Sequence, residues 1–302
     1  MLELTLALKR LQQRFEYLKL DEPLAPHTYW KVGGPARAFL HPPTTDEFIR
    51  ALDLSRDLGI RTVVIGGGSN ILVSDNGFEG LVIRAGGRDC EQLSERTIQV
   101  GAGVPLSTFL NFAAQAGLSV PSVELFVGVP GTIGAAIFGN IGGVEVVFGL
   151  FTKEVTYWDN GTIHTISGPD CEFGYRTSRF KQRGGIVLSG VFRLNSADPV
   201  TIRTAMEKGL KQKRETQPLN LPSGGSVFKH PEGMKAWKLI DDAGLRGKQI
   251  GGAQISDMHA NFIVNKGNAT AEDVVILISL IKQQVRDKFN IQLTEEIQYI
   301  GF

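Results

Sequence analysis

The chain has 302 residues, 32 of them basic and 31 acidic, so its formal net charge is +1. This balance excludes the electrostatic footprint of a protein that binds nucleic acid or an anionic membrane. A hydrophobic content of 42% and a charged content of 21% are typical of a soluble globular protein, and this length predicts about two domains. The two cysteines, Cys90 and Cys171, make no disulfide framework or metal-ligand spacing, so we expect a reducing, cytoplasmic location.

The N-terminal segment predicts an amphipathic helix, because apolar residues recur at helical spacing from Leu4 to Leu18. It holds no apolar core followed by small residues, so it does not resemble a signal peptide. The most apolar helix expected, Val274 to Ile281, is too short to span a bilayer. We therefore expect no membrane partner.

The next predicted unit is a helix followed by two strands. Thr44 and Glu47 form a capping-box pattern, and Gly59 takes the place where a helix ends. The remaining expected elements, in chain order, are strands over 62–65, 81–84 and 97–103, a helix from Pro105 to Gly117, a hairpin of 155–158 with 162–166 around Asn160-Gly161, a strand over 186–194, a polar helix over 199–216, a helix over 236–243, a strand over 261–264, a long helix over 271–288 and a last strand over 296–300.

Two glycine-rich loops follow strand-like runs, at 66–70 and 128–136. The first lacks the Rossmann pattern, because Ile71 stands in place of the third glycine and no helix pattern opens there. Successive backbone N–H groups in such bends can still form an anion nest. Together the loops suit a large dinucleotide held by backbone amides; tight turns with close strand packing are the alternative.

A third loop, Pro222 to Lys229, contains two serines, two glycines, an aromatic residue and a lysine. Glycine lets the backbone come close to a ligand and adopt a positive φ. A serine after such a bend can be held rigidly with its hydroxyl exposed, which suits a proton donor or an anion contact. An ordinary polar turn before a strand is the alternative.

A set of motifs occurs in one order over nearly the whole chain. The motifs are Val32 to Ala36, Gly66 to Asn70 with Asp75 to Gly80 after it, Gly128 to Ala136, Gly174 to Phe180, the serine loop, Ala243 to Gly247, His259 to Phe262 and Glu296 to Gly301. With these motifs the chain resembles the UDP-N-acetylenolpyruvoylglucosamine reductase family, flavoenzymes of bacterial peptidoglycan precursor synthesis. Few residues separate Arg179 from the strand expected at Ile186. The chain therefore looks like a member of the shorter branch of this family, which lacks a tyrosine-bearing insertion.

The resemblance implies an α+β protein with a vanillyl-alcohol-oxidase-type FAD-binding fold of two α+β subdomains and a separate α+β substrate-binding domain. The implied boundaries are 1–85 with 296–302, 86–198, and 199–295. It also implies that NADPH, as co-substrate, reduces UDP-N-acetylglucosamine enolpyruvate to UDP-N-acetylmuramate through FAD. Neither glycine loop contains Cys or His, so the FAD is expected to be non-covalent. We expect a monomer or weak oligomer.

Three residues carry over from the family as the catalytic group. Ser226 matches the proton donor, Arg176 the arginine that holds the substrate carboxylate, and Glu296 an acidic partner. An arginine fork suits the planar carboxylate on which negative charge develops, and one proton must then reach the central carbon. We expect these side chains to converge. The adjacent Glu295 is expected in solvent, because neighbouring strand residues face opposite ways.

The other expected contacts concern the two ligands. The residues expected to hold FAD are Ile65, Gly66, Gly67, Gly68, Ser69, Asn70, Gly128, Val129, Pro130, Gly131, Thr132, Gly134, Ala135, Ala136 and Asn140. Those expected to bind substrate are Tyr175, Arg176, Lys229, His230 and His259. Lys229 is also a helper for the serine acid, and His230 stands where relatives carry Asn. The five histidines show no metal-ligand spacing, so no metal is expected.

Alternatives remain at this point. Arg176 could pair with Glu172 on the surface. The chain could be another FAD-linked oxidase or dehydrogenase on the same fold, against which Arg176, Ser226 and Glu296 argue together. It could also be a non-catalytic nucleotide-binding protein, which would need the glycine loops but neither the serine loop nor Glu296.

Overall fold

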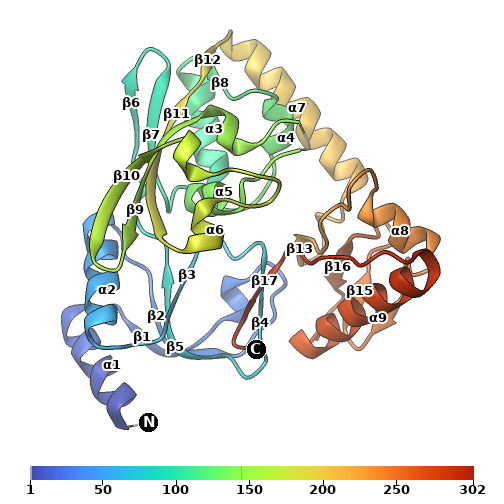
Figure 1. Ribbon diagram of the computed structural model, residues 1–302, viewed down its shortest axis with the longest axis horizontal. Helices are drawn as coiled ribbons and strands as arrows, with labels where there is room; N and C mark the ends of the chain where they lie inside the picture. The colour runs from blue at the N-terminus through green and yellow to red at the C-terminus, as the bar shows by residue number, and fades with distance from the viewer. Residues whose placement is uncertain (1, 144) are drawn as a thin grey trace. The chain divides into compact units, whose positions relative to one another are not determined.

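The computed structural model describes residues 2–143 and 145–302 (Figure 1). The chain forms two compact units. The first unit draws on 1–20, 38–67 and 80–212, and the second on 21–37, 68–79 and 213–302. Helices and strands are mixed in both, in agreement with the expected α+β class.

The helices and strands have the following bounds. The α-helices are α1 (Leu2–Arg14), α2 (Thr45–Asp57), α3 (Leu106–Gln115), α4 (Val123–Phe126), α5 (Ile133–Gly139), α6 (Arg179–Arg183), α7 (Pro199–Thr216), α8 (Ala236–Asp242) and α9 (Ala271–Phe289), and the 3-10 helices are η1 (Ala25–His27), η2 (Phe148–Phe151) and η3 (Pro169–Cys171). The strands are β1 (Lys19–Pro23), β2 (Pro35–Leu40), β3 (Thr62–Ile65), β4 (Ile71–Val73), β5 (Phe78–Arg84), β6 (Cys90–Ser94), β7 (Thr97–Gly101), β8 (Leu118–Ser119), β9 (Thr152–Asp159), β10 (Thr162–Ser167), β11 (Ile186–Arg193), β12 (Asn195–Ser196), β13 (Ser223–Ser226), β14 (Gln249–Ile250), β15 (Ala253–Ile255), β16 (Phe262–Asn265) and β17 (Gln298–Ile300).

A five-stranded sheet of order β10-β9-β11-β7-β6 dominates the first unit, and all its neighbouring strands are antiparallel. The predicted hairpin is confirmed: Thr162 pairs with Asp159 across a two-residue turn. Asn160 and Gly161 have φ values of 48° and 90°, the positive pair that a tight hairpin turn requires. Strands β3 and β5 form a parallel pair in the sheet of order β1-β2-β5-β3.

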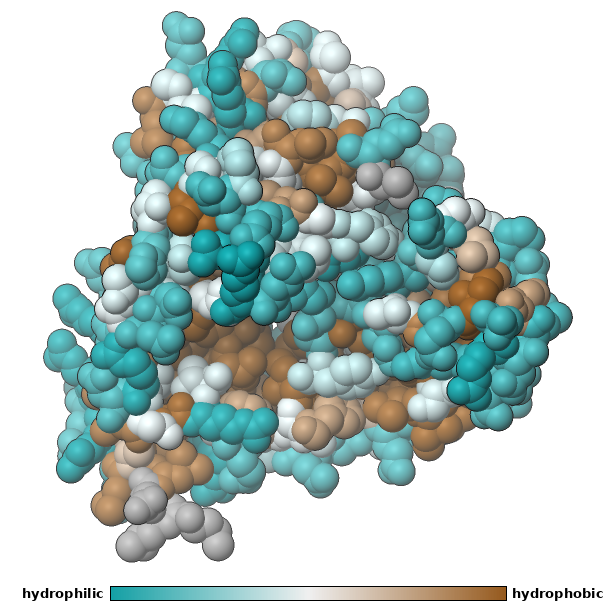
Figure 2. Space-filling view, in the orientation of Figure 1, coloured by the Kyte–Doolittle hydropathy of each residue, from teal (hydrophilic) through white to brown (hydrophobic). Residues whose placement is uncertain are grey.

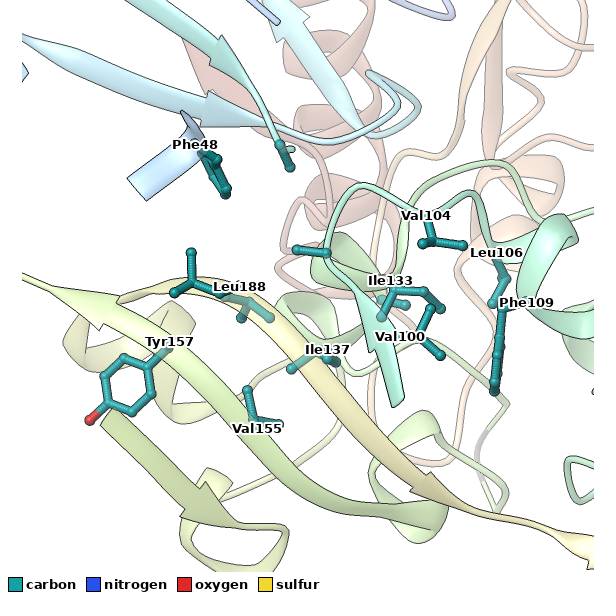
Figure 3. Close-up of a cluster of buried hydrophobic side chains, with 14 of the residues drawn as sticks. Phe48, Val100, Val104, Leu106, Phe109, Ile133, Ile137, Val155, Tyr157 and Leu188 are labelled. Carbon is teal, nitrogen blue, oxygen red and sulfur yellow. The ribbon is translucent and has the colours of Figure 1, made fainter. Parts of the chain in front are cut away.

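Part of the core of the first unit lies between the five-stranded sheet and α5. Figure 3 shows Ile133 and Ile137 of α5 facing Val100, Val155 and Leu188 from the strands. A cluster of phenylalanines extends the same core, and its rings meet mostly edge to face, as aromatic pairs prefer. The cluster consists of Phe109, Phe126, Phe148, Phe151 and Phe192.

The second unit contains an antiparallel sheet of order β13-β16-β15-β14, over which α9 packs. The helix buries a stripe of apolar residues at helical spacing, from Val274 to Val285. Strand β17 pairs in parallel with β4 of the same unit, with Tyr299 opposite Leu72.

The N-terminus of α9 is capped twice. Thr270 and Asp273 form a reciprocal capping box. The Asp75 carboxylate also accepts hydrogen bonds from the N–H groups of Ala271 and Glu272, at 2.9 and 3.1 Å. Asp75 therefore ties the segment after the first glycine loop to the longest helix.

Most of the predicted long elements are confirmed, α7 with the bounds predicted and α2 with its Thr44 cap. The prediction missed β4, which begins at Ile71 and lies between two strands that were expected to be consecutive. None of the helices in 2–143 and 145–302 combines the length and the apolar character that crossing a bilayer requires. The face seen in Figure 2 is largely hydrophilic, with apolar side chains in small groups.

Candidate active site

The two glycine-rich loops meet in the first unit. A Cβ placed on Gly66 would come within 2.6 Å of Thr132 Oγ1, and one on Gly67 within 3.2 Å of the Gly131 Cα. A side chain at Gly66 would require Thr132 to move, and one at Gly67 would crowd Gly131, so glycine favours this close approach of the loops. The chain after Gly67 enters β4 rather than a helix, which agrees with the predicted departure from the Rossmann pattern.

Thr132 carries an unsatisfied hydroxyl at this meeting point. Its side chain is 8% exposed, and its Oγ1 atom is buried with no hydrogen-bond partner among the described residues. A buried polar atom without a partner is costly and calls for an explanation. A dinucleotide lying along the two loops would supply an acceptor for this hydroxyl, so the residues present fit FAD.

Asn140 anchors a neighbouring loop. It is fully buried, and its side-chain amide donates to the Gly174 carbonyl and accepts from the Gly149 N–H, both at 2.8 Å. These bonds hold the turn that contains Arg176. The flavin contact expected for Asn140 stays a prediction, while its visible role is to fix this turn.

Tyr175 and Arg176 occupy the two tip positions of a tight turn closed by Gly174 and Thr177. Arg176 has a φ of 55°, a left-handed conformation that is uncommon for non-glycine residues. Its guanidinium carbon lies 5.4 Å from the centre of the Tyr175 ring, within the range of a cation–π contact. Glu172, the surface partner considered for Arg176, forms an ion pair with Arg183 at 2.7 Å.

The serine loop belongs to the second unit and rests on Trp30. The indole is 1% exposed, and its Nε1 donates to the Ile263 carbonyl at 2.7 Å. Gly224 lies directly on the ring, and Gly225 follows with a φ of 77°. Both glycines are thus required by the path of the chain that leads to Ser226.

Ser226 and Glu296 lie on adjacent stretches of backbone. The Glu296 N–H donates to the carbonyl of Val227 at 2.8 Å, and the Lys229 N–H donates to that of Thr294 at 2.9 Å. Asn70, at the end of the first glycine loop, donates from Nδ2 to the Glu296 carbonyl at 3.2 Å. The second unit therefore brings together three of the sequence-predicted segments.

Glu295 does not lie in solvent as expected. Its carboxylate pairs with Lys282 of α9 at 2.8 Å, and its side chain is 23% exposed. The expectation placed both glutamates on a strand and took the face of Glu295 to be open, whereas β17 begins only at Gln298. The long helix α9 covers that face and supplies the cation.

Both histidines of the predicted substrate site accept a backbone hydrogen bond at Nδ1. His230 accepts from Ala236 N at 3.2 Å, and His259 from Asn261 N at 3.3 Å. Each imidazole therefore keeps Nε2–H as its donor when it is neutral. Burial is the main cause that lowers the pKa of His259, with a smaller effect from His230. Neutral rings of this kind can donate to anionic oxygens.

The predicted residues thus form one group in each unit. Gly66, Gly67, Gly131 and Thr132 meet in the first unit, which also carries the Arg176 turn. Ser226, Lys229, His230, His259 and Glu296 belong to the second unit. Sequence reasoning missed Trp30, although its place just before the Val32 to Ala36 motif was a signal available in the sequence.

Known families match both parts of the chain. Residues 36–167 match an FAD binding domain, and residues 217–300 match the C-terminal domain of UDP-N-acetylenolpyruvoylglucosamine reductase. The first match bears out the expected FAD-binding fold and cofactor. The second is a domain of the reductase family, and the full-length relatives set aside both alternatives, a different FAD enzyme and a non-catalytic nucleotide-binding protein.

Curated relatives and a solved structure agree with these matches. The chain is 42% identical over 285 residues to UDP-N-acetylenolpyruvoylglucosamine reductase 1 of Bacillus anthracis, which covers 93% of this chain and 94% of the relative. It is 41% identical over 289 residues to the reductase of Caldicellulosiruptor bescii, with 95% and 91% covered. The crystal structure of UDP-N-acetylenolpyruvylglucosamine reductase from Thermus caldophilus superposes with a TM-score of 0.78 at 32% identity, covering 94% of this chain and 98% of that one.

Proposed function

The chain belongs to the UDP-N-acetylenolpyruvoylglucosamine reductase family, oxidoreductases of peptidoglycan precursor synthesis, and we propose that it reduces its substrate with NADPH and with Ser226 as proton donor. The enolpyruvyl double bond of UDP-N-acetylglucosamine enolpyruvate gains one hydride and one proton, which yields UDP-N-acetylmuramate, while NADPH becomes NADP⁺. The chemistry supplied by bound FAD is hydride transfer from NADPH to the terminal carbon of that double bond.

Gly66, Gly67, Gly131 and Thr132 hold the FAD in this proposal. The close approach of the two loops and the unsatisfied Thr132 hydroxyl support it. Backbone N–H groups bind the pyrophosphate, and the Thr132 hydroxyl donates to an oxygen of the cofactor. The contacts expected from Ser69, Asn70 and the remaining loop residues belong to the same proposal.

Ser226 delivers the proton that the central carbon of the substrate needs. The observation that carries this role is the bond from Glu296 N to the Val227 carbonyl, because it keeps the backbone of the acidic partner one residue from the serine. The indole of Trp30 packs directly against Gly224, two residues before the serine, and so supports the loop from one side. Such preorganisation is what general acid catalysis requires.

Arg176 binds the substrate carboxylate, on which negative charge develops during hydride transfer. The turn holds the backbone of Arg176, and the Tyr175 ring contacts its guanidinium; both observations support this role. Lys229, His230 and His259 donate to the remaining anionic groups of the substrate. The convergence of Arg176 with Ser226 and Glu296 is part of the proposal, as is the division into 1–85 with 296–302, 86–198 and 199–295.

Anaerobic stopped-flow spectroscopy of the flavin tests the central role. In the Ser226→Ala variant, NADPH should bleach the flavin at the wild-type rate, whereas UDP-N-acetylglucosamine enolpyruvate should restore its colour about 10²–10⁴ times more slowly. Wild-type speed in both steps would remove Ser226 from the mechanism.

The proposal also includes a cytoplasmic, monomeric or weakly oligomeric protein without nucleic-acid or membrane partners. Light scattering on the purified holoenzyme measures the oligomeric state.

A further inference from the structure

Asn261 holds the backbone just after Ser226 with three hydrogen bonds. Its side-chain Oδ1 accepts from the Phe228 N–H at 3.0 Å, and its Nδ2 donates to the Phe228 carbonyl at 2.8 Å. Its own carbonyl accepts from the Val227 N–H at 2.8 Å. Asn261 is 1% exposed, so these bonds form away from water.

The Asn261 side chain takes the place of a neighbouring strand for Phe228, which lies beyond the end of β13. Strand β13 ends at Ser226, which is paired with Phe262, the first residue of β16. The register between β13 and β16 is irregular between Ser223 and Ser226. The regular strand pairing therefore ends at the serine itself. A carboxamide has one donor and one acceptor side by side, and it can satisfy both backbone groups of a single residue.

Val227 and Phe228, the residues bound by Asn261, also contact the segment that contains Glu296. Val227 accepts from the Glu296 N–H, and Phe228 forms a β-bridge with Glu295. Val227 and Phe228 are 0% and 1% exposed. The segment is thus bound on one side by Asn261 and on the other by the backbone of Glu295 and Glu296, just before β17. His259 fixes Asn261 in turn, by accepting from its N–H at 3.3 Å.

We propose that Asn261 is a positioning residue for proton donation: by clamping Phe228, it sets the place of the Ser226 hydroxyl relative to Glu296. This inference rests on the proposed role of Ser226. Without the clamp, the loop still lies on Trp30, but its last residue is free to shift by a fraction of an ångström. A proton donor is sensitive to shifts of this size, whereas hydride transfer from NADPH does not use it.

The test compares Asn261→Ala with Asp273→Ala in the FAD-loaded full chain. In the control, the Asp273 carboxylate no longer accepts a part-buried bond from Gly252 N and an exposed bond from Thr270 N, both in the same unit. Neither bond reaches 223–229 or 294–298. Both variants are measured for NADPH bleaching, for recolouring by the enolpyruvyl substrate, and for amide hydrogen exchange in a peptide over 224–231.

We expect Asn261→Ala to slow recolouring about 10- to 100-fold with bleaching unchanged, and to speed exchange over 224–231. Asp273→Ala should lower the melting temperature yet leave both steps and this peptide unchanged. Recolouring at the wild-type rate in Asn261→Ala, or equal slowing in the control, overturns the positioning role. Wild-type enzyme that is bleached by NADPH but never recoloured by the substrate overturns the proposed function itself, and the clamp's role falls with it.

An aspartate variant gives a second, sharper readout and covers the case in which the alanine variant does not fold. A protonated aspartic acid is close in shape to asparagine and can donate O–H to the Phe228 carbonyl while it accepts from the N–H. The carboxylate instead repels that carbonyl, and burial raises its pKa. Recolouring by Asn261→Asp should therefore recover towards wild type as the pH falls. Lys229, Glu295, Glu296 and His259 are the charged or ionisable residues near Asn261, so wild type is measured at every pH as the reference. If the ratio of the recolouring rate of Asn261→Asp to that of wild type does not change with pH, the positioning role of Asn261 is contradicted.

Discussion

The indole of Trp30 lies directly against Gly224: a Cβ placed on that glycine would fall 2.5 Å from the ring atom Cζ3. The ring itself is fixed by the bond from its Nε1 to the Ile263 carbonyl. Trp30 therefore supports the serine loop from below, although it is 194 positions from Gly224 in the sequence.

Gly224→Ala should destabilise the folded protein by about 1–3 kcal/mol, because the new methyl group meets a ring that cannot move away. Urea unfolding of the purified variant measures this loss. In a Trp30→Phe background the six-membered part of the indole is gone, and the same substitution should cost less. Equal costs in the two backgrounds would show that the ring is not what excludes the methyl group.

Thr132→Val should weaken FAD binding by about tenfold, because it removes the hydroxyl that the cofactor satisfies. The apoprotein should melt at the same or a higher temperature, since an unsatisfied buried hydroxyl is lost. Titration of apoprotein with FAD and thermal melts measure both effects.

Thr152→Val is the matched control. Thr152 is 7% exposed, against 8% for Thr132, but its hydroxyl donates to the Phe148 carbonyl at 2.9 Å. Its loss should cost about 1 kcal/mol of stability and leave FAD affinity unchanged. The reverse pattern in the two variants would mean that the Thr132 hydroxyl plays no part in the cofactor site.

Asp273 should make the stability of the protein fall in acid. Hydrogen bonds, first from Thr270 N and then from Gly252 N, lower the pKa of this carboxyl below its ordinary value of 3.8. A group with a lowered folded pKa stabilises the protein fully above its unfolded pKa, and this contribution is lost as the pH falls through 3.8 to the folded value. In Asp273→Asn, the free energy of unfolding should therefore fall less than in wild type between about pH 5 and pH 3. Chemical denaturation at several pH values measures the difference, and parallel curves would contradict it.

Both cysteines should react slowly in the native protein. Burial raises the pKa of Cys90 to about 11 and that of Cys171 to about 12, so at pH 8 roughly a thousandth or less of either thiol is the reactive thiolate. Ellman's reagent should label neither thiol quickly until the protein is unfolded, when both should titrate. Rapid labelling of the native protein would mean that one of them is accessible and activated.

Several elements could be predicted from the sequence because their signals are local. The Thr44 cap, the Asn160-Gly161 turn and the stripe of α9 each depend on residues a few positions apart. Short polar strands had no such signal: β6 reads Cys-Glu-Gln-Leu-Ser with its last four residues exposed. The segment forms a strand because it pairs with β7 along the edge of the five-stranded sheet. Pairing with a distant partner, rather than propensity, decides strands of this kind.

By itself the sequence determined the family, the α+β class, the glycine loops and the identity of the serine that we propose as the acid. Those depend on residue types in a fixed order, which a chain displays before it folds. Only the tertiary structure decided that Trp30 supports the serine loop, that Asn261 clamps Phe228 and that Lys282 pairs with Glu295. The first two links join residues that are distant in the chain, and the third joins α9 to the segment that follows it. Their energy comes from burial and hydrogen-bond geometry, which exist only once the strands and α9 are packed.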